Sequence, residues 1–319
     1  MASRLRGVAL RVLFAGTPDF AVPTLAAIHA AGHEIVAVIT QPDRPAGRGR
    51  RLQPSAVKTQ ALDYGLTVLT PARCSAVNWA DYPCDVMVVV AYGLLLPQAV
   101  LDHPKYGCLN VHPSALPAYR GAAPIQHTLL NGESTTAVSI IRMVLAMDAG
   151  PIVAQTQQVI GPKETSGTLH TRFAQVGAEM IVSVLARLEA TGEIDALPQV
   201  EADATYAPKI QKAQAALKWC LSARALDQQV RAFSPWPVAY TAHEGVRIRI
   251  HQAIYRETSG SGAPGTLVAI DDAAVWVATG EGELGLQCIQ RPGGRVVSAV
   301  AYARTAPDWV VGHTKFIEE

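Results

Sequence analysis

The hydrophobic and polar positions alternate between strand and helix signals over the first two-thirds of the chain. Apolar runs at residues 8–15 and 33–40 predict strands, and residues 20–31 between them predict a helix. The near-continuous apolar run at residues 85–91 is typical of a central strand that is buried on both faces. This alternation predicts an α/β fold with a doubly wound, mostly parallel sheet.

The same signals continue to residue 192. Residues 107–112 predict another strand, and residues 136–144 and 151–160 predict two strands joined by a short turn. Residues 168–191 carry apolar positions at helical spacing and predict a long helix. Residues 193–208 contain few large apolar side chains and two prolines, so we expect a linker there between a first domain at 1–192 and a second at 209–319.

The second domain shows a different pattern, with short alternating segments between turn signals. Strands are expected at residues 239–243, 246–254, 265–270, 274–278 and 284–290. Short strands at this spacing predict a small β-barrel.

Composition narrows the class of protein further. Of the 319 residues, 49% are hydrophobic and 17% are charged, which excludes a disordered or fibrous chain. The longest uncharged stretch, residues 86–101, is shorter than the ~18–20 apolar residues of a membrane-spanning helix, and no signal peptide is recognised. The five cysteines are widely spread without a C-x-x-C pair, so we expect reduced thiols in a cytoplasmic protein, with no zinc site and no disulfide framework.

Charge is distributed unevenly, although the formal net charge is only +1. Residues 41–58 carry five basic side chains and one acidic one, and residues 209–256 carry eight and two. The chain as a whole is therefore no polybasic nucleic-acid binder, but the two basic segments are suited to a defined anionic partner that touches both domains. Charge runs are more often solvated faces, so charge alone does not decide for nucleic acid.

Three polar residues stand where strands of the first domain are expected to end. Asn110 and His112 are two positions apart on a predicted strand, so their side chains share a face. At the carboxyl end of a strand in an open α/β sheet, an amide and an imidazole can hydrogen-bond a developing oxyanion. Asp148 lies in a predicted turn. All three have a plainer interpretation, because strand-end Asn and His often satisfy loop backbone and Asp often forms turns.

A longer motif connects these residues, NVHPSALPAYRG at 110–121 with MDAG at 147–150. It resembles the formyltetrahydrofolate-dependent formyltransferases, which carry an N-x-H-x-S-L-L-P signature and a later Asp-x-Gly turn. The resemblance to the branch of that family that formylates methionyl-tRNA extends almost end to end. It includes FAGTPDFA at 14–21, QPDRPAGRG at 41–49, VVVAYGL at 88–94, GAAPIQ at 121–126 and RAFSPWP at 231–237.

The resemblance implies a Rossmann-like catalytic domain followed by an OB-type β-barrel domain that contacts tRNA. It implies transfer of a formyl group from 10-formyltetrahydrofolate to the α-amino group of methionine on initiator tRNA, without a metal, by a protein that we expect to be a monomer. Asn110 and His112 would donate hydrogen bonds to the formyl oxygen. Asp148 would orient His112, favour its protonated form or hold a proton-shuttling water.

The resemblance also assigns a folate-binding loop, which comprises Ser114, Ala115, Leu116 and Pro117. Leu116 would offer apolar contact to the flat folate. The chain departs from the family pattern here, because Ala115 replaces a usual Leu. Pro113 replaces the Gly that is more typical of the tRNA enzymes. These changes put details of the folate pocket in question rather than the chemistry.

The basic loop at residues 41–53 matches the family insertion that enters the acceptor end of the tRNA. Arg48 matches its key arginine, and Arg44, Arg50 and Arg51 would contact phosphates. A formyltransferase for an amino sugar or a purine-synthesis intermediate would share the three polar residues but has no use for this loop. A catalytically silent tRNA- or folate-binding module is the alternative of another class.

Overall fold

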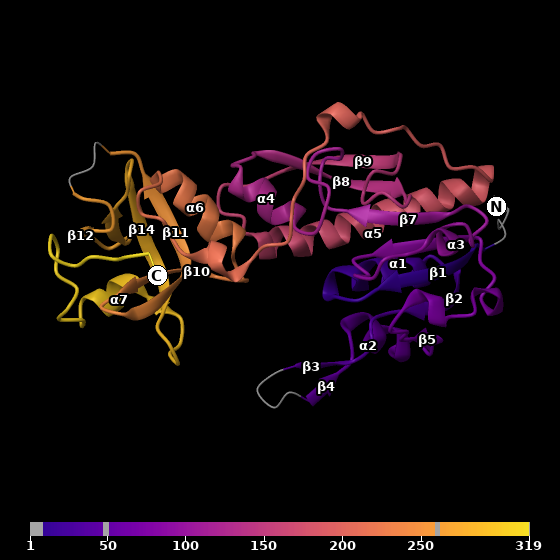
Figure 1. The fold of residues 1–319 in the computed structure, drawn as a ribbon, viewed down its shortest axis with the longest axis horizontal. Coiled ribbons are helices and arrows are strands. Elements are labelled where there is room, and N and C mark those ends of the chain that lie inside the picture. The colour runs from indigo at the N-terminus through magenta and orange to yellow at the C-terminus, as the bar shows by residue number, and fades with distance from the viewer. Residues whose placement is uncertain (1–8, 47–50, 259–261, 319) are drawn as a thin grey trace, which may run out of the picture. The chain divides into compact units, whose positions relative to one another are not determined.

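The computed structural model describes residues 9–46, 51–258 and 262–318, and these divide into two compact units (Figure 1). Unit 1 takes the described residues up to Pro124, together with Thr135–Val159 and His170–Ala207. Unit 2 takes Ile125–Ser134, Ile160–Leu169 and the described residues from Pro208 onward. The chain therefore passes between these units several times, and the linker predicted at residues 193–208 stays a prediction.

Residues 160–169 belong to unit 2 through hydrogen bonds that the local sequence pattern does not predict. The hydroxyl of Ser166 and the backbone N–H of Gly167 both donate to the carbonyl oxygen of Ser234, at 2.7 and 2.9 Å. The guanidinium of Arg231 donates to the carbonyl oxygen of Glu164 at 3.3 Å. Contacts with residues distant in sequence thus place residues 160–169 in unit 2.

Unit 1 is built on a seven-stranded sheet with the strand order β5-β2-β1-β6-β7-β8-β9. The first five of these strands run parallel, and β8 pairs antiparallel with both β7 and β9, which confirms the predicted mostly parallel sheet. The strands are β1 Arg11–Gly16, β2 Glu34–Ile39, β5 Val68–Leu69, β6 Val86–Val90, β7 Cys108–His112, β8 Thr135–Arg142 and β9 Ile152–Val159. The helices are α1 Val22–Ala30, α2 Ala56–Asp63, α3 Gln98–Leu101 and α5 Ser166–Thr191, the last of which begins in unit 2.

The core of unit 1 follows from the apolar strands. All five positions of β6 are buried, as the apolar run at 85–91 predicts for a central strand. Helix α5 packs closely on β7, because a Cβ at Gly177 would press against the side chain of Val111. This close approach holds the carboxyl end of β7, where Asn110 and His112 lie, on a rigid support.

The segment at residues 41–53, expected as a basic loop, contains a short antiparallel pair of strands. Strands β3 Arg44–Ala46 and β4 Arg51–Gln53 pair through Arg44 with Gln53 and Ala46 with Arg51. Three-residue strands rich in Arg, Pro and Gln carry too little apolar alternation to be recognised. We call this element the basic hairpin, and it projects from unit 1 in Figure 1.

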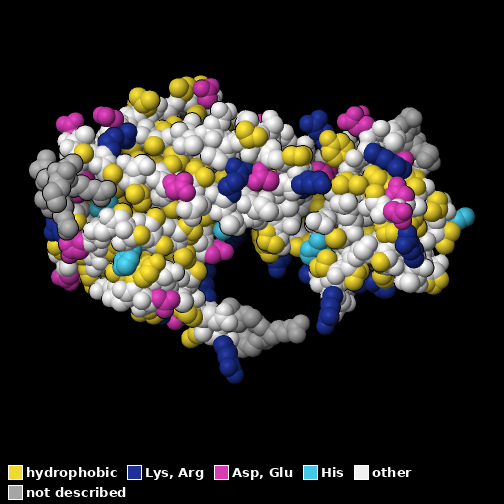
Figure 2. All heavy atoms as spheres, turned by 180° about the vertical axis from the view of Figure 1, so that it is seen from behind, with side chains coloured by type: hydrophobic (Ala, Val, Ile, Leu, Met, Phe, Trp, Pro, Cys, Tyr) yellow, Lys and Arg dark blue, Asp and Glu magenta, His cyan; other side chains and the backbone are white. Residues whose placement is uncertain are grey.

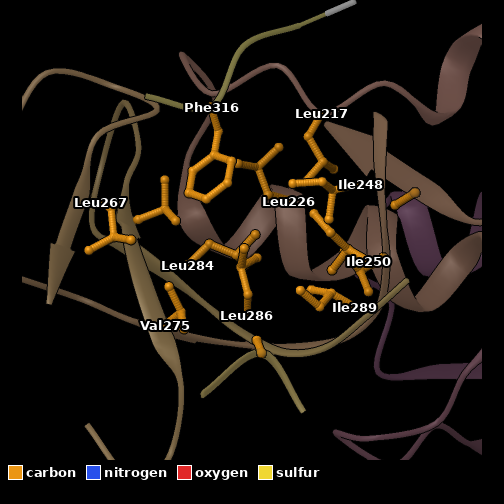
Figure 3. Packing of buried hydrophobic residues seen from close by; sticks show 14 of the residues in the cluster. Leu217, Leu226, Ile248, Ile250, Leu267, Val275, Leu284, Leu286, Ile289 and Phe316 are labelled. Carbon is orange, nitrogen blue, oxygen red and sulfur yellow. The ribbon is translucent and has the colours of Figure 1, made fainter. Parts of the chain in front are cut away.

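Unit 2 contains a six-stranded antiparallel sheet with the order β10-β11-β14-β13-β12, on which β15 pairs with β14. The strands are β10 Ala239–His243, β11 Val246–Arg256, β12 Leu267–Ile270, β13 Val275–Ala278, β14 Glu283–Gln290 and β15 Val297–Ser298. The helices are α6 Ala223–Ala232, α7 Ala299–Ala303 and nearly all of α4 Pro124–Leu130. Figure 3 shows the core, in which Leu226 of α6, Ile250 of β11 and Leu286 of β14 gather with Phe316.

Residues near the end of the described chain contact both edge strands of this sheet. The N–H of Ile317 donates to Ala242 O of β10 at 2.8 Å, and the N–H of Phe316 donates to Gly265 O before β12 at 2.8 Å. We call residues 314–317 the edge segment. The strands predicted for the second domain form an antiparallel sheet, but β10 and β12 do not pair with each other among the described residues, so a closed OB-type barrel stays a prediction. No helix in the described part of the chain is long and apolar enough to cross a membrane.

Candidate active site

Strand β7 presents Asn110 and His112 near the carboxyl end of the parallel strands. Asn110 is half-buried, and His112 is buried with 4% of its surface exposed. The Nε2 atom of His112 lies 3.0 Å from the carbonyl oxygen of Tyr119. Because a carbonyl oxygen only accepts, Nε2 carries the proton, and Nδ1 of the neutral ring has a lone pair. Nδ1 is therefore the ring atom that is left to exchange a proton.

Asp148 comes to His112 from the loop that joins β8 and β9. Its carboxylate Oδ2 lies 3.7 Å from Nδ1 of His112 and accepts a hydrogen bond from the N–H of Gly121 at 2.8 Å. Its backbone has a φ of 51°, which turns the chain sharply at this point. The structure thus brings the carboxylate of Asp148 and the imidazole of His112 together.

Three residues clamp the Asp148 loop. The side-chain amide of Gln199 donates to the carbonyl oxygens of Asp148 and Gly150, both at 2.7 Å. Its own oxygen accepts from Nε of Arg120 at 3.0 Å. The guanidinium of Arg120 is 2% exposed and pairs with the carboxylate of Glu201 at 2.9 Å.

The sequence alone does not indicate this clamp. Gln199 and Glu201 lie in the segment expected as a linker, and Arg120 belongs to the motif but had no assigned role. The only local signal is an arginine inside a motif of small and apolar residues, which hints at a buried ion pair. Its partners, 79 and 81 positions away, carry no local signal at all.

The predicted folate-binding loop begins shortly after His112, and side chains of β8 and β9 hold it by hydrogen bonds to its backbone. Ser139 of β8 donates to the carbonyl oxygen of Ser114 at 2.7 Å, and Gln155 of β9 donates to that of Leu116 at 3.0 Å. The side chain of Leu116, expected to contact folate, is buried with 3% exposed, while Ala115 and Pro117 are half-buried. The contact between Leu116 and folate stays a prediction.

Three other sequence segments that resemble the formyltransferases contribute residues around one backbone carbonyl. The hydroxyl of Thr17 and the side-chain amide of Gln41 both donate to the carbonyl oxygen of Tyr92 at 2.8 Å. These residues follow β1, β2 and β6, which end at the same edge of the sheet. The strings FAGTPDFA, QPDRPAGRG and VVVAYGL thus hold together the loops at the carboxyl ends of the strands.

Two of the four arginines that are predicted to contact tRNA lie among the described residues of the basic hairpin. Arg44 on β3 and Arg51 on β4 are exposed, while Arg48 and Arg50 lie outside the described residues. Asp43 at the base of the hairpin pairs with Lys58 at 2.9 Å, so its charge is compensated locally. Among the described residues, no hydrogen bond or ion pair joins the hairpin to His112 or Asp148.

Comparisons with known proteins agree in both parts of the chain. The formyl transferase family profile matches residues 10–185, and the formyl transferase C-terminal domain profile matches residues 209–307. A methionyl-tRNA formyltransferase of Paraburkholderia phytofirmans is 46% identical over 301 residues, which cover 90% of this chain and 91% of the relative. A methionyl-tRNA formyltransferase of Xanthomonas euvesicatoria is 46% identical over 305 residues, covering 94% and 98%.

A solved structure shares the fold at much lower sequence identity. The N-formyltransferase of Helicobacter canadensis, in complex with folinic acid and dTDP-3-aminofucose, aligns with a TM-score of 0.67. It is 17% identical and covers 88% of this chain and 99% of its own. At this identity the match speaks for the fold alone.

Proposed function

Because the chain belongs to the formyl transferase family, we propose that it transfers a formyl group from 10-formyltetrahydrofolate to the α-amino group of methionine on initiator tRNA. The approach of Asp148 to Nδ1 of His112, at 3.7 Å on the support of β7, is the observation that carries the chemistry. The identity of 46% to relatives that are methionyl-tRNA formyltransferases supports the choice of acceptor.

The chemistry needs the tetrahedral intermediate to be stabilised more than it needs a strong base. A free α-amino group titrates near ~8, so much of the attacking amine is neutral at pH 7. As the amine adds to the formyl carbon, negative charge develops on the formyl oxygen. Asn110 donates to that oxygen, and so does Nδ1–H of His112 once the ring is protonated.

Asp148 lies where it can orient this donor. With Nε2–H held by Tyr119 O, His112 can donate at Nδ1 only when that nitrogen carries a proton, and the carboxylate of Asp148 lies 3.7 Å from it. The amine loses one proton and N10 of the folate gains one, so the reaction consumes no base. Asp148 relays this proton directly or through a water.

The basic hairpin supplies the recognition of tRNA in this proposal. Its exposed Arg44 and Arg51, together with Arg48 and Arg50, contact the acceptor end and its phosphates. On the face shown in Figure 2, basic and acidic side chains are interspersed rather than gathered into one basic field. The edge segment, bonded to both β10 and the turn before β12, supports a closed OB-type barrel in unit 2.

The decisive experiment for the chemistry compares acceptors and site variants under saturating substrates. The full-length protein should formylate initiator Met-tRNA from 10-formyltetrahydrofolate and act poorly on elongator Met-tRNA and on a nucleotide-linked amino sugar. Replacing Asn110, His112 or Asp148 by Ala should each lower the rate about 100–1,000-fold with little change in tRNA affinity. Near-normal turnover by His112→Ala would defeat the assignment, and a preference for the amino sugar would favour that alternative.

The hairpin is tested by salt and by matched variants. Arg48→Ala should retain folate binding and lose efficiency on initiator Met-tRNA, while Arg73→Ala, an exposed arginine of unit 1 outside the hairpin, should not. Efficiency at subsaturating tRNA should fall as salt rises, with a shallower slope in the Arg50→Ala/Arg51→Ala double variant. Wild-type efficiency of Arg48→Ala would leave the hairpin without a role in recognition.

The folate loop is tested at the position where the chain departs from its family. Since Leu116 is buried, substitutions there would disturb the fold as well as the cofactor. Ala115 is half-buried, so Ala115→Leu restores the usual family side chain at lower risk. We expect this variant to change the dissociation constant for folate while leaving affinity for tRNA unaltered. An unchanged folate constant would mean that position 115 does not contact the cofactor.

A further inference from the structure

His243, at the end of β10 in unit 2, has a buried ring nitrogen that makes no hydrogen bond to the described residues. Its Nδ1 lies 2.9 Å from the carbonyl oxygen of Lys315, so Nδ1 carries the proton and donates it. Nε2 of the neutral ring therefore has a lone pair. It is buried and finds no hydrogen-bond partner among the described residues, in a side chain that is 9% exposed. An unsatisfied buried acceptor of this kind is costly unless something binds it.

The carboxylates of Asp308 and Glu244 lie near this nitrogen. Oδ2 of Asp308 lies 3.6 Å from Nε2, which is too long for a good hydrogen bond. Glu244 follows His243 in the β10–β11 turn, and one ligand atom from each of the three residues lies within 4.8 Å of the others. The ring of Phe316, with its centroid 5.7 Å from that of His243, packs beside the imidazole and fixes its direction.

We propose that His243, Glu244 and Asp308 bind one divalent transition-metal ion of the zinc class. A ligating imidazole in proteins usually donates its other N–H to a backbone carbonyl or carboxylate, as Nδ1 of His243 does to Lys315. An imidazole with two carboxylates suits Zn²⁺, whereas Mg²⁺ and Ca²⁺ prefer oxygen ligands alone.

The distances fit this coordination. With metal–ligand bonds of about 2.1 Å, two atoms 3.6 Å apart subtend an angle of about 118° at the ion, near the tetrahedral value. Glu244 is exposed, so its side chain can close the remaining gap by a rotamer change. A water would take the fourth position. The ion would join the β10–β11 turn to the chain around the edge segment.

The competing explanation needs no metal. If His243 were protonated, Asp308 would simply hold the charged ring as an ion pair. This alternative predicts no tight zinc binding, and it predicts that zinc does not change the thermal stability of the protein.

The test uses the full chain after treatment with a chelator, titrated with ZnCl₂ by calorimetry. We expect one ion per chain at this site and a rise in Tm that the chelator reverses. Asp308→Asn should weaken binding at least ~10-fold, and His243→Gln should abolish it. Asp308→Asn should keep the fold, because the chain there is held by the hydroxyl of Thr314, which donates to the backbone carbonyl of Asp308 at 2.8 Å.

A matched control separates this site from incidental binding to surface histidines or thiols. His313→Gln removes an exposed histidine from the same stretch of chain and should leave zinc binding unchanged. Co²⁺ in place of Zn²⁺ should give a spectrum without a thiolate charge-transfer band. Wild-type zinc affinity in Asp308→Asn, no zinc binding by the parent protein, or a thiolate band from Cys220 would each overturn the proposal.

Discussion

Gln199→Leu is expected to damage catalysis without touching any reacting group. The substitution removes three hydrogen bonds, two to the carbonyl oxygens of Asp148 and Gly150 and one from the guanidinium of Arg120. At about 1 kcal/mol for each neutral bond and about 2 kcal/mol for the charged one, the loss is at most about 4 kcal/mol. Gln199 is half-buried, so water replaces part of this, and we expect a loss of about 2 kcal/mol in the free energy of unfolding.

The effect on the rate should exceed what lost stability explains. Released from Gln199, the Asp148 loop no longer holds its carboxylate at 3.7 Å from His112, and misplacement by about 1 Å costs on the order of 100-fold in rate. Steady-state kinetics with saturating tRNA and folate should show kcat reduced about 10–100-fold, with KM for both substrates little changed.

Two further variants sharpen this test. Gln199→Glu keeps an acceptor for Arg120 but has no N–H for the two carbonyl oxygens, so it should fail to restore kcat. Gln158→Leu is the matched control, a half-buried glutamine of β9 that bonds Arg172 at 2.7 Å away from the site. If Gln199→Leu lost stability as expected but kept wild-type kcat, the clamp would be purely structural and the reasoning refuted.

Two other predictions concern packing and buried thiols in unit 1. Gly150→Ala should fail to fold or lose activity, because the added Cβ would overlap the carbonyl oxygen of Arg142; Gly161→Ala, which meets only a glutamate side chain at 3.5 Å, should be tolerated. Soluble, active Gly150→Ala would contradict this. Burial raises the pKa of the Cys84 thiol to about 11 and that of Cys108 to about 12, so both are neutral in the folded state and ionise more readily when unfolded. Their contribution to stability is complete below about pH 9 and is lost progressively as the pH rises from about 9 to about 12. Urea unfolding should therefore show a free energy of unfolding that falls between these two pH values, and that falls less steeply in the Cys84→Ala/Cys108→Ala variant.

The parts of unit 1 that could be predicted are those in which the local pattern of apolar residues shows that a segment is buried. The run at residues 85–91 indicated β6 because a strand covered on both faces must be apolar along its length. Asn110 and His112 were recognisable because two polar residues at strand spacing end such a run. Asp148 needed the family motif, since a turn aspartate alone is common.

What could not be predicted depends on contacts between distant segments. Gln199 and Glu201 look like any polar linker, and their roles exist only because Arg120 is buried beside them. The cluster of His243, Glu244 and Asp308 in unit 2 could not be predicted for the same reason, because Asp308 lies far along the chain from His243. Metal spacing rules recognise ligands that lie close in sequence, and this cluster is assembled by the turn after β10 and a much later segment.

The edge segment sets an order of events during synthesis. Residues 314–317 bond both β10 and the turn before β12, and the ribosome makes them after every strand that they join. Until they leave the exit tunnel, the two edges of the unit 2 sheet keep backbone groups that another nascent chain can pair with. Translation that stalls or terminates before residue 314 would release a chain with all the strands of its second sheet and no cover for their edges, a form suited to aggregation and to clearance by proteases.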